Sequence, residues 1–383
     1  MTNTTLTDIH AVCIKKNIPF ASWRTPNEKN CKTIIANKAQ KLKSPDFTSL
    51  KGFVASPFNF FTKKNLWLLS PDYFFENNNF DMSSLFGFPD ADSNPDKEIY
   101  YSSFDDYKKQ FTHFKKLFAN NTLQKGVLSR IIKTETTHRG NAEQLFKKLT
   151  ESYPDAMVYI INIPGEGLWI GATPEPFIKT NNERYQTSSV AATQPFTGKS
   201  IKWSEKEIEE QQIVTDYITG VLKKTGITDF TKQRPKTYRA GNVSHLKTDF
   251  TISKEIIKPH LNNFLHNLHP TPAVCGIPKQ DAYNEILRTE HHNREFYTGF
   301  LGSVGMEEDL QLFVNLRCMQ IFEKHSAVYV GGGLTSGSVL ESEWRETEYK
   351  SASLLRIAET THTKTFNTHD NDYNGDFHPT NKN

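Results

Sequence analysis

Four consecutive stretches of the chain have the composition of β-strands, and they limit the possible folds more than any other feature. Each is rich in β-branched, aromatic and other apolar residues, and turn-forming residues separate them. They span residues 126–134, 156–164, 167–180 and 183–193. A run of strands in this half of the chain excludes an all-helical protein.

Helical patterns follow the strands. Ser204 and Glu207 form a capping box, which predicts a helix running to about Lys224 and stopping near Gly226. Two further helices are predicted at 285–296 and 340–357, with strands between them at 312–322 and 327–331. No internal repeat or domain linker is visible, so the prediction is a single large α+β domain.

The two ends of the chain are less regular. Residues 1–115 contain recurring aromatics and Asn/Asp/Pro clusters, which predict short strands and loops. We expect one catalytic domain over residues 1–361. Residues 362–383 are polar and lack apolar periodicity, so they are expected to form a disordered tail.

The composition is that of a globular protein. Of 383 residues, 36% are hydrophobic and 12% aromatic, including 27 Phe, which is enough for a sizeable core. The net charge is +3, from 46 basic and 43 acidic residues. This balance gives no support to nucleic-acid binding. A slight positive excess suits a small anionic substrate.

Cysteine spacing and hydropathy indicate a cytoplasmic protein. The four cysteines are widely separated and form no CxxC motif, so neither a zinc site nor a disulfide framework is expected. The polar beginning of the chain does not resemble a signal peptide. No apolar run is long enough to span a bilayer, so no membrane association is expected.

The segment 268–278, LHPTPAVCGIP, is rich in proline and cannot form a regular helix or a central strand. Each proline fixes its own φ and moves the preceding residue away from helical values. The result is a rigid loop. Such a loop can hold a ligand or simply make a tight connection, and the residues alone leave both possibilities open.

A carboxylate lies on the apolar stripe of the predicted helix that begins near Ser204. Glu210 is four residues before Val214 and therefore on the same helical face. An inward carboxylate at this position would need a partner. The alternative is an exposed first-turn glutamate that the helix dipole favours.

The last predicted helix repeats this pattern. Its apolar stripe carries Leu354 and Ile357, and the same stripe leads back to Lys350, Glu346 and Glu343. The simple interpretation is an i,i+4 ion pair on a solvated face. Two helices that each direct a carboxylate inward favour a second interpretation, a Mg²⁺ site, because this ion prefers hard oxygen ligands.

Between a predicted strand and the last helix lies a glycine-rich turn, Gly331–Gly333. Its spacing is not GxGxxG and no Gly-Lys-Ser/Thr follows, so it matches neither a dinucleotide-binding nor a Walker motif. Glycines here would let backbone N–H groups approach an anion. A carboxylate-binding turn and a structural turn both remain open.

The order of these motifs resembles the chorismate-utilising enzymes, over residues 120–356. The LHPTPAVCGIP loop is similar to the signature loop of one branch, the isochorismate synthases. The other matching segments are KGVLSR at 125–130, GATPEPF at 171–177, VAAT at 190–193, EEQQIV at 209–214, HLKT at 245–248, NREFYTGFLG at 293–302, VNLRCMQ at 314–320, and EWRETEYK at 343–350.

The resemblance implies a fold, an activity and catalytic residues. The fold would be α+β, with layered antiparallel β-sheets flanked by helices. The activity would be the Mg²⁺-dependent conversion of chorismate to isochorismate. Lys125 would be the base that activates water for attack at C2, and Glu175 the acid that protonates the departing C4 hydroxyl. Burial would raise the pKa of such a glutamate.

The resemblance also implies a metal site and substrate contacts. Glu210 and Glu346 would bind Mg²⁺, and Glu343 would support them through water. The residues implied in substrate binding are Ala192, Thr193, His245, Ala273, Tyr297, Arg317, Gly331, Gly333 and Lys350. A monomer acting on chorismate in menaquinone or siderophore biosynthesis is expected.

The chain departs from the pattern it resembles at Ala192, where a glycine usually precedes the threonine. In one branch a nucleophilic lysine occupies the position of Ala191, and alanine cannot take that role. Two alternatives remain. One is a salicylate synthase, which also eliminates pyruvate, and the other is a non-catalytic anion-binding relative. The LHPTPA loop favours the simple isomerase, and the presence of both Lys125 and Glu175 argues against a non-catalytic protein.

Overall fold

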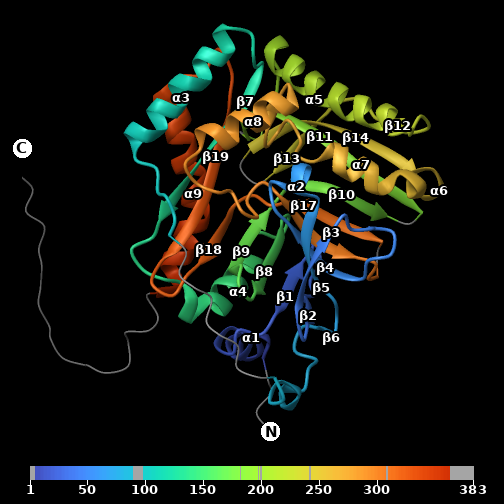
Figure 1. The fold of residues 1–383 in the computed structure, drawn as a ribbon, viewed down its shortest axis with the longest axis vertical. Helices are drawn as coiled ribbons and strands as arrows, with labels where there is room; N and C mark the ends of the chain where they lie inside the picture. The colour runs from blue at the N-terminus through green and yellow to red at the C-terminus, as the bar shows by residue number, and fades with distance from the viewer. Residues whose placement is uncertain are drawn as a thin grey trace, which may run out of the picture.

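Two antiparallel β-sheets stacked on each other form the centre of the molecule (Figure 1). The computed structural model describes residues 5–88, 98–181, 183–196, 198, 201–240, 243–307 and 309–362. The predicted tail, apart from His362, lies outside the described residues. All statements about the structure below refer to these ranges.

The first sheet has nine strands. In spatial order they are β15 (Gly276–Ile277), β7 (Lys125–Lys133), β19 (Ser326–Leu334), β18 (Cys318–Ile321), β9 (Gly167–Thr173), β8 (Met157–Ile163), β1 (Phe20–Arg24), β2 (Lys32–Ile35) and β6 (Tyr73–Glu76).

The second sheet has ten strands. Its spatial order is β12 (Thr231–Lys232), β14 (Val243–Ser253), β11 (Arg184–Pro195), β10 (Pro176–Asn181), β17 (Leu310–Val314), β16 (Phe300–Val304), β4 (Gly52–Ser56), β5 (Asn65–Leu69) and β3 (Ala39–Lys43), and β13 (Lys236–Ala240) also pairs with β14.

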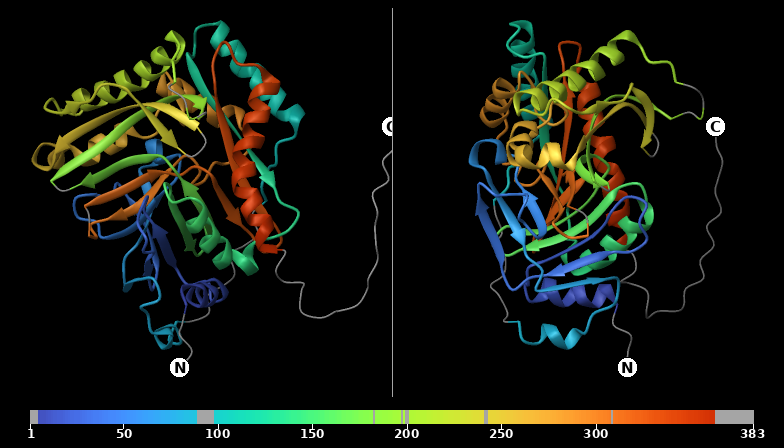
Figure 2. Two further views of the ribbon diagram at one scale, coloured as in Figure 1. Left: turned by 180° about the vertical axis from the view of Figure 1, so that it is seen from behind. Right: turned by 90° about the vertical axis from the view of Figure 1, so that its right-hand side faces the viewer.

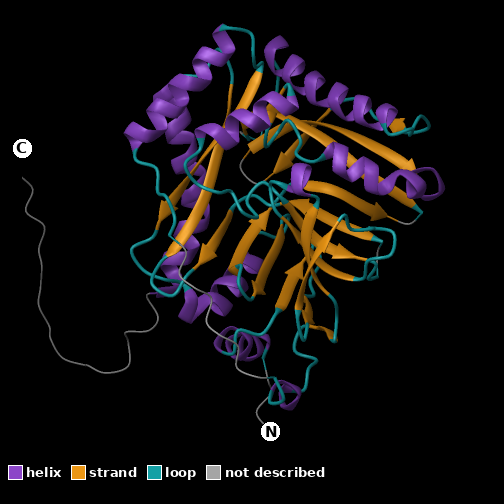
Figure 3. Cartoon of the chain, in the orientation of Figure 1, coloured by secondary structure: helices purple, strands orange, loops and turns teal. Residues whose placement is uncertain are grey.

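Helices cover the outer faces of both sheets (Figure 3). The α-helices are α1 (Leu6–Lys15), α2 (Phe60–Lys63), α3 (Phe104–Ala119), α4 (Ala142–Ser152), α5 (Glu205–Lys224), α6 (Lys254–Ile257), α7 (Leu261–Leu268), α8 (Lys279–Thr289) and α9 (Leu340–His362). Short 3₁₀ turns lie at Met82–Leu85, Arg139–Asn141 and Lys258–His260.

Buried apolar side chains divide the molecule into layers. One cluster joins α1, α4 and α9 to the first sheet, and another joins α5 and α7 to the second sheet. A third cluster, which includes Trp23, Phe53 and Trp169, fills the space between the sheets. Figure 2 shows α9 along the first sheet, with α3 beside it. This arrangement confirms the predicted α+β class and its layered antiparallel sheets.

The N-terminal region is part of the same structure. β1 pairs with β8 in the first sheet, and β4 pairs with β16 in the second. The short strands predicted for this region are therefore present. The helices α1, α3 and α4 were not predicted. The sequence does contain signals for α3. These are a capping box at Ser103 and Asp106 and an apolar stripe of Tyr107, Phe111 and Phe114.

Two predicted strands each prove to be two strands in different sheets. Residues 167–180 form β9 in the first sheet and β10 in the second, and the chain crosses between sheets at Pro174 and Glu175. Residues 312–322 make the reverse crossing, from β17 to β18, near Arg317. The crossings lie side by side, because Val314 N donates to Glu175 O (2.9 Å) and Ala172 N to Arg317 O (3.1 Å).

The helix predicted at 285–296 was wrong in its second half. The helix α8 begins at Lys279 and ends at Thr289, and Glu290 is already extended (φ −73°, ψ 127°). Glu290 and Arg294 form the ion pair that their spacing suggests, but no helix joins them, and both side chains also bind β7. The helix starting after Ser204 was predicted correctly, including its capping box. No helix in the described ranges is both long and apolar enough to cross a membrane.

Candidate active site

The proline-rich loop places Lys125 at the start of β7. Residues Gly276 and Ile277 pair with Gly126 and Lys125, and Val127 N donates to Cys275 O (2.8 Å). Gly276 is required here, because its φ is +150° and a Cβ would lie 2.3 Å from Lys125 O. The loop therefore fixes the backbone that carries Lys125.

A half-buried lysine holds the beginning of this loop. Lys279, at the start of α8, donates to the carbonyl oxygens of Asn267 (2.7 Å) and His269 (2.5 Å). Its ammonium also lies 4.2 Å from the ring centre of Phe61. Burial lowers the pKa of Lys279 to about 7. The carbonyls at the end of α7 have no partner inside the helix. Lys279 and the hydroxyl of Tyr217 both donate to Asn267 O, so they join helix and loop.

The ammonium group of Lys125 lies among carboxylates and glycines. Lys125 Nζ donates to Glu210 Oε1 at 3.3 Å, and the lysine side chain is only 13% exposed. A Cβ at Gly333 would lie 3.1 Å from Lys125 Cε. The lack of a side chain at Gly333 therefore leaves space beside Lys125, and any other residue at position 333 would reduce that space.

Glu210 is held in place through its neighbour in α5. Gln211 is buried, and its Nε2 donates to Ser189 Oγ of β11 (2.9 Å) and to Thr248 Oγ1 of β14 (3.3 Å). These contacts fix the first turns of α5 on the second sheet. Glu210 therefore faces Lys125 of the first sheet, and the inward interpretation of this carboxylate is the one that the geometry supports.

The last helix brings its charged side chains to the glycines of β19. Lys350 Nζ binds Glu346 Oε1 at 2.6 Å and also donates to Gly331 O at 3.0 Å. A Cβ at Gly332 would lie 3.4 Å from Glu343 Oε2 and 3.7 Å from Glu346 Oε1. The predicted i,i+4 pair of Glu346 and Lys350 is present. It does not face solvent alone, because Lys350 also binds the backbone of β19.

Glu175 lies at the sheet crossing between β9 and β10. Burial raises the pKa of Glu175 to about 7, although the positive charges of Lys125 and Lys350 act to lower it. The carboxyl group can therefore hold a proton near neutral pH and release it to a leaving group. The two lysines that act on Glu175 are the two that contact Glu210 and Glu346, so these five side chains belong to one site.

Arg317 and Tyr297 contribute a cation and a hydroxyl. Arg317 is partly buried at the second sheet crossing, and it forms no ion pair within the described ranges. Burial lowers its pKa, and its charge acts on His245. Tyr297 is buried, and its hydroxyl oxygen would lie 3.0 Å from a Cβ at Gly331. A guanidinium and a phenol placed like this can bind a carboxylate.

The departure at Ala192 has a visible conformational consequence. Ala192 has φ +58° and lies at an irregularity where β11 shifts its register against β14. Left-handed values are costly for alanine and free for glycine. His245 Nδ1 donates to Ala192 O at 3.0 Å. Burial lowers the pKa of His245, the hydrogen bond to Ala192 O acts to raise it, and the charges of Arg317 and Lys350 lower it further, so its pKa lies below the ordinary value.

Comparison with known proteins identifies the family. Residues 85–359 match the family described as chorismate binding enzyme. The chain belongs to this family. Its match to isochorismate synthase EntC of Escherichia coli K12 is 27% identical over 250 residues, which cover 63% of this chain and 64% of EntC. The matched segment therefore spans a little less than two thirds of that relative.

Solved structures share the fold of this chorismate-binding family member. MenF, the menaquinone-specific isochorismate synthase from Escherichia coli, superposes with a TM-score of 0.73 at 19% identity. The superposition covers 91% of this chain and 90% of the MenF chain. Anthranilate synthase component I from Streptococcus pneumoniae has a TM-score of 0.64 at 17% identity, with coverages of 79% and 80%. At these identities the similarity is one of fold.

Two of the predicted substrate residues have no described side-chain contact with the others. The backbone of Thr193 pairs with His245, but the side chain of Thr193 lies outside the described residues. Ala273 is partly exposed in the proline-rich loop. The remaining predicted residues gather around β19, α5, α9 and the two sheet crossings.

The predicted metal ligands are near one another but do not form a ready-made cluster. Within the described ranges, no group of three His, Cys, Asp or Glu side chains is arranged to hold a metal ion. Glu343 and Glu346 approach Gly332 together, while Glu210 and Glu346 each bind a lysine. As a donor set, three carboxylates suit Mg²⁺ well. An ion would compete with the two lysines for these oxygens.

A buried ion pair that the sequence interpretation did not assign supports the whole site. Glu290 accepts from Arg294 Nη2 (2.6 Å) and from the backbone N–H of Ser129 (2.7 Å) in β7. Arg294 Nη1 donates to Val274 O in the loop, and Nη2 to Val127 O, both at 2.8 Å. The pair therefore connects the loop to the strand that begins with Lys125. An acid and an arginine four residues apart were visible in the sequence, but their partners were not.

Proposed function

We propose that this chain is an isochorismate synthase, which converts chorismate to isochorismate. The supporting observation is the combination of Lys125 and Glu175 in one site, with the pKa of Glu175 raised to about 7. These side chains come from the first sheet and from a crossing between the sheets. They supply the base and the acid that the displacement of one hydroxyl by another requires.

In the proposed reaction Lys125 accepts a proton from water as the water oxygen bonds to C2 of chorismate. The ring double bond shifts, and the C4–O bond breaks. Glu175 gives its proton to the departing hydroxide, which leaves as water. The water that enters and the water that leaves balance, so isochorismate is an isomer of chorismate. The lysine proton and the glutamate charge are exchanged with solvent before the next turnover.

Substrate carboxylates have two proposed receptors. Arg317 and Tyr297 would bind the enolpyruvyl carboxylate, with the backbone of Gly331 and Gly333 beside them. Arg317 lacks an ion-pair partner within the described ranges, which leaves its guanidinium available to an anion. His245 and Lys350 would line the remainder of the substrate site, with Ala192, Thr193 and Ala273.

Mg²⁺ is the proposed cofactor, with Glu210 and Glu346 as ligands and Glu343 supporting them through water. When bound, the ion would neutralise the ring carboxylate of the substrate. The carboxylates of Glu210 and Glu346 would then exchange their lysine partners for the cation. Lys125 released from Glu210 would be free to act on water.

A covalent route through a lysine is not available at position 191. Ala191 has no nucleophile, so the attacking group must be a free molecule in the site. We therefore expect oxygen from isotopically labelled water at C2 of the product. Intact-protein mass spectrometry during turnover should detect no chorismate-derived adduct, and an adduct would contradict water attack.

The decisive experiment is product analysis after incubation of the full chain with chorismate and Mg²⁺. Isochorismate without pyruvate supports the proposal. Release of stoichiometric pyruvate would identify a salicylate synthase instead. An absence of any turnover, with chorismate still bound in a direct binding measurement, would identify a non-catalytic relative.

A further inference from the structure

Two polar side chains of α5 contact the unit that the proline-rich loop forms with β7. Glu210, in the second turn of the helix, accepts from Lys125 Nζ at the start of β7 (3.3 Å). Tyr217 lies seven residues later, so it is on nearly the same helical face and about 10 Å farther along the axis. Its hydroxyl lies 2.9 Å from Asn267 O and 3.0 Å from Leu268 O, where α7 ends and the loop begins. One helix therefore contacts both the start of the loop and the strand to which the loop leads.

The far end of the loop is bound firmly to β7. Val127 N donates to Cys275 O at 2.8 Å. Gln124 N donates to Ile277 O at the same distance. The buried arginine described above adds hydrogen bonds to carbonyl oxygens of both segments. The two amides lie on either side of Lys125 in the sequence, so a shift of the loop would move the backbone that carries the Lys125 ammonium.

Lys279 completes the contact at the start of the loop. Its ammonium has three N–H donors, and it donates to three oxygens: Asn267 O, His269 O and the hydroxyl of Tyr217, at 2.7, 2.5 and 3.2 Å. The ring face of Phe61, 4.2 Å away, adds a cation–π contact. The hydroxyl of Tyr217 accepts from the lysine and donates to the loop, so it connects this group of contacts to α5.

We propose that Lys279 and Tyr217 are positioning residues, which set the placement of Lys125 against Glu210. Neither of the two touches the reacting atoms. They hold the start of the loop on α5, and strand pairing carries that constraint to Lys125. Because Glu210 belongs to the same helix, one contact fixes the base and the proposed metal ligand relative to each other. The catalytic consequence rests on the proposed function, whereas the structural link between loop and strand does not.

Hydrogen exchange of the full chain, without substrate, tests the structural link. In Lys279→Met the amides of Gln124 and Val127 should exchange at least about tenfold faster than in the wild type, because their acceptors in the loop are loosened. Exchange in β8, on the far side of the first sheet, reports global opening and should not change. Lys279→Arg keeps a cation with several donors and should recover part of the protection. Lys223→Met, at an exposed lysine in the last turn of α5, is the matched control and should match the wild type.

Steady-state kinetics with chorismate tests the catalytic consequence. Lys279→Met should lower kcat at least about tenfold, since a displacement of about 1 Å in a catalytic site can cost about 10²-fold. Tyr217→Phe removes a single oxygen and should lower kcat by a smaller factor, and it tests the same link if Lys279→Met does not fold. The double variant should lose less than the product of the two single effects, because both side chains serve one contact.

Several outcomes would overturn the inference. One is unchanged exchange at Gln124 and Val127 in Lys279→Met, and another is equal acceleration in β8, which would show a loss of global stability alone. Faster local exchange with wild-type kcat would show that Lys125 tolerates the movement, and independent effects of the two substitutions would contradict a shared contact. A wild-type chain that makes no isochorismate would overturn the proposed function instead, and hydrogen exchange would still decide whether the loop positions Lys125.

Discussion

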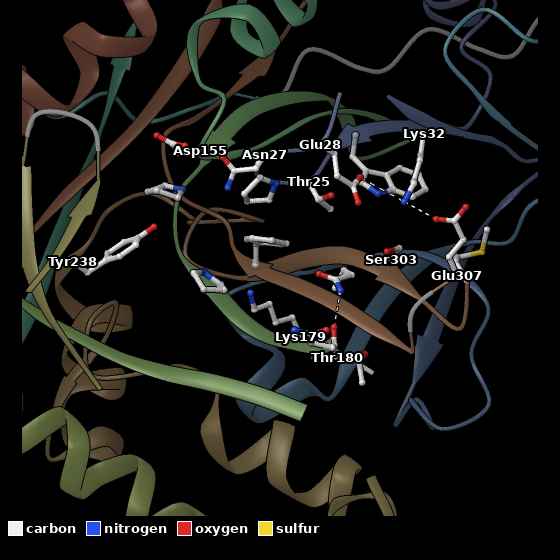
Figure 4. A pocket seen from close by; sticks show the side chains of 18 of the residues that line it. Thr25, Asn27, Glu28, Lys32, Asp155, Lys179, Thr180, Tyr238, Ser303 and Glu307 are labelled. Atoms are coloured by element: carbon white, nitrogen blue, oxygen red, sulfur yellow. Dashed lines mark hydrogen bonds and ion pairs between the residues drawn. The ribbon is translucent and has the colours of Figure 1, made fainter. Parts of the chain in front are cut away.

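The candidate active site and a cavity of about 520 Å³ that Trp23, Lys179 and Phe313 help to line (Figure 4) both draw residues from the two sheets, but their charges are arranged differently. In the active site, Lys125 and Lys350 face the carboxylates of Glu210 and Glu346. In the cavity, Lys179 has no carboxylate of its own. Paired charges can exchange their partners for a substrate and a cation, whereas Lys179 has no ion-pair partner to exchange within the described ranges.

If the active site works as proposed, the largest losses of activity should follow from replacing the base Lys125 or the acid Glu175. Lys125→Ala and Glu175→Gln should each lower kcat by about 10²–10⁴-fold, because a positioned acid or base contributes about that much. Steady-state kinetics with chorismate measures the loss. Lys133→Ala, at the exposed end of the same strand as Lys125, is the matched control and should keep wild-type activity. Near-native turnover of either active-site variant would remove that residue from its proposed role.

Removal of the metal tests whether the carboxylates of the active site are reserved for a cation. Chelation with EDTA should abolish activity, and added Mg²⁺ should restore it. In calorimetric titration with Mg²⁺ alone, Glu346→Gln should bind at least about tenfold more weakly than the wild type. Glu341→Gln, in the first turn of the same helix, should bind normally. Full activity after thorough chelation would exclude the metal role.

The cation at the second sheet crossing should matter for substrate affinity. Arg317→Ala should lower kcat/KM by tens to thousands of fold, since an anion that loses its charged partner costs about 2–5 kcal/mol. Arg317→Lys keeps the charge without the planar fork, so it should recover only part of the loss. A change of less than about twofold in Arg317→Ala would place this residue outside the substrate site.

The pKa of Glu175 predicts the alkaline side of the pH profile. A general acid must hold its proton, so kcat should fall as pH rises above about 7, by about tenfold per pH unit. Lys350 favours the ionised form of Glu175, so Lys350→Met should raise this pKa and move the decline to higher pH. A decline that stays at the same pH in Lys350→Met would assign it to another group.

The smallest expected effect is at Ala192. Ala192→Gly removes left-handed strain of about 1–2 kcal/mol but adds about 0.4–1 kcal/mol of unfolded-state entropy. The variant should therefore be slightly more stable in thermal unfolding, and its KM should fall modestly as a methyl is lost. Ala191→Gly, one residue earlier in β11, should be less stable than the wild type. Equal destabilisation by both changes would contradict the conformational argument.

The contrast between the two regions also shows how far the sequence could be interpreted. Local patterns gave the strands, the capped helix at Ser204 and the last helix, because these depend on periodicity and on caps. They did not give the division of 167–180 into β9 and β10, because both halves have strand composition and only packing assigns them to separate sheets. The same limit explains the false second half of the helix at 285–296, where Glu290 binds Ser129 instead of continuing the helix.

By itself, the sequence determined the α+β class and the identity of the chemical groups, since Lys125, Glu175 and Arg317 stand in recognisable motifs. Only the tertiary structure decided which of them meet. The two sheet crossings that carry Glu175 and Arg317 lie side by side, and strand pairing joins the proline-rich loop to Lys125. The cavity beside Lys179 could not be found from the sequence, because its lining extends from Trp23 to Phe313 without a motif. A local pattern specifies an element, whereas a site forms from distant residues that only the packing of those elements brings together.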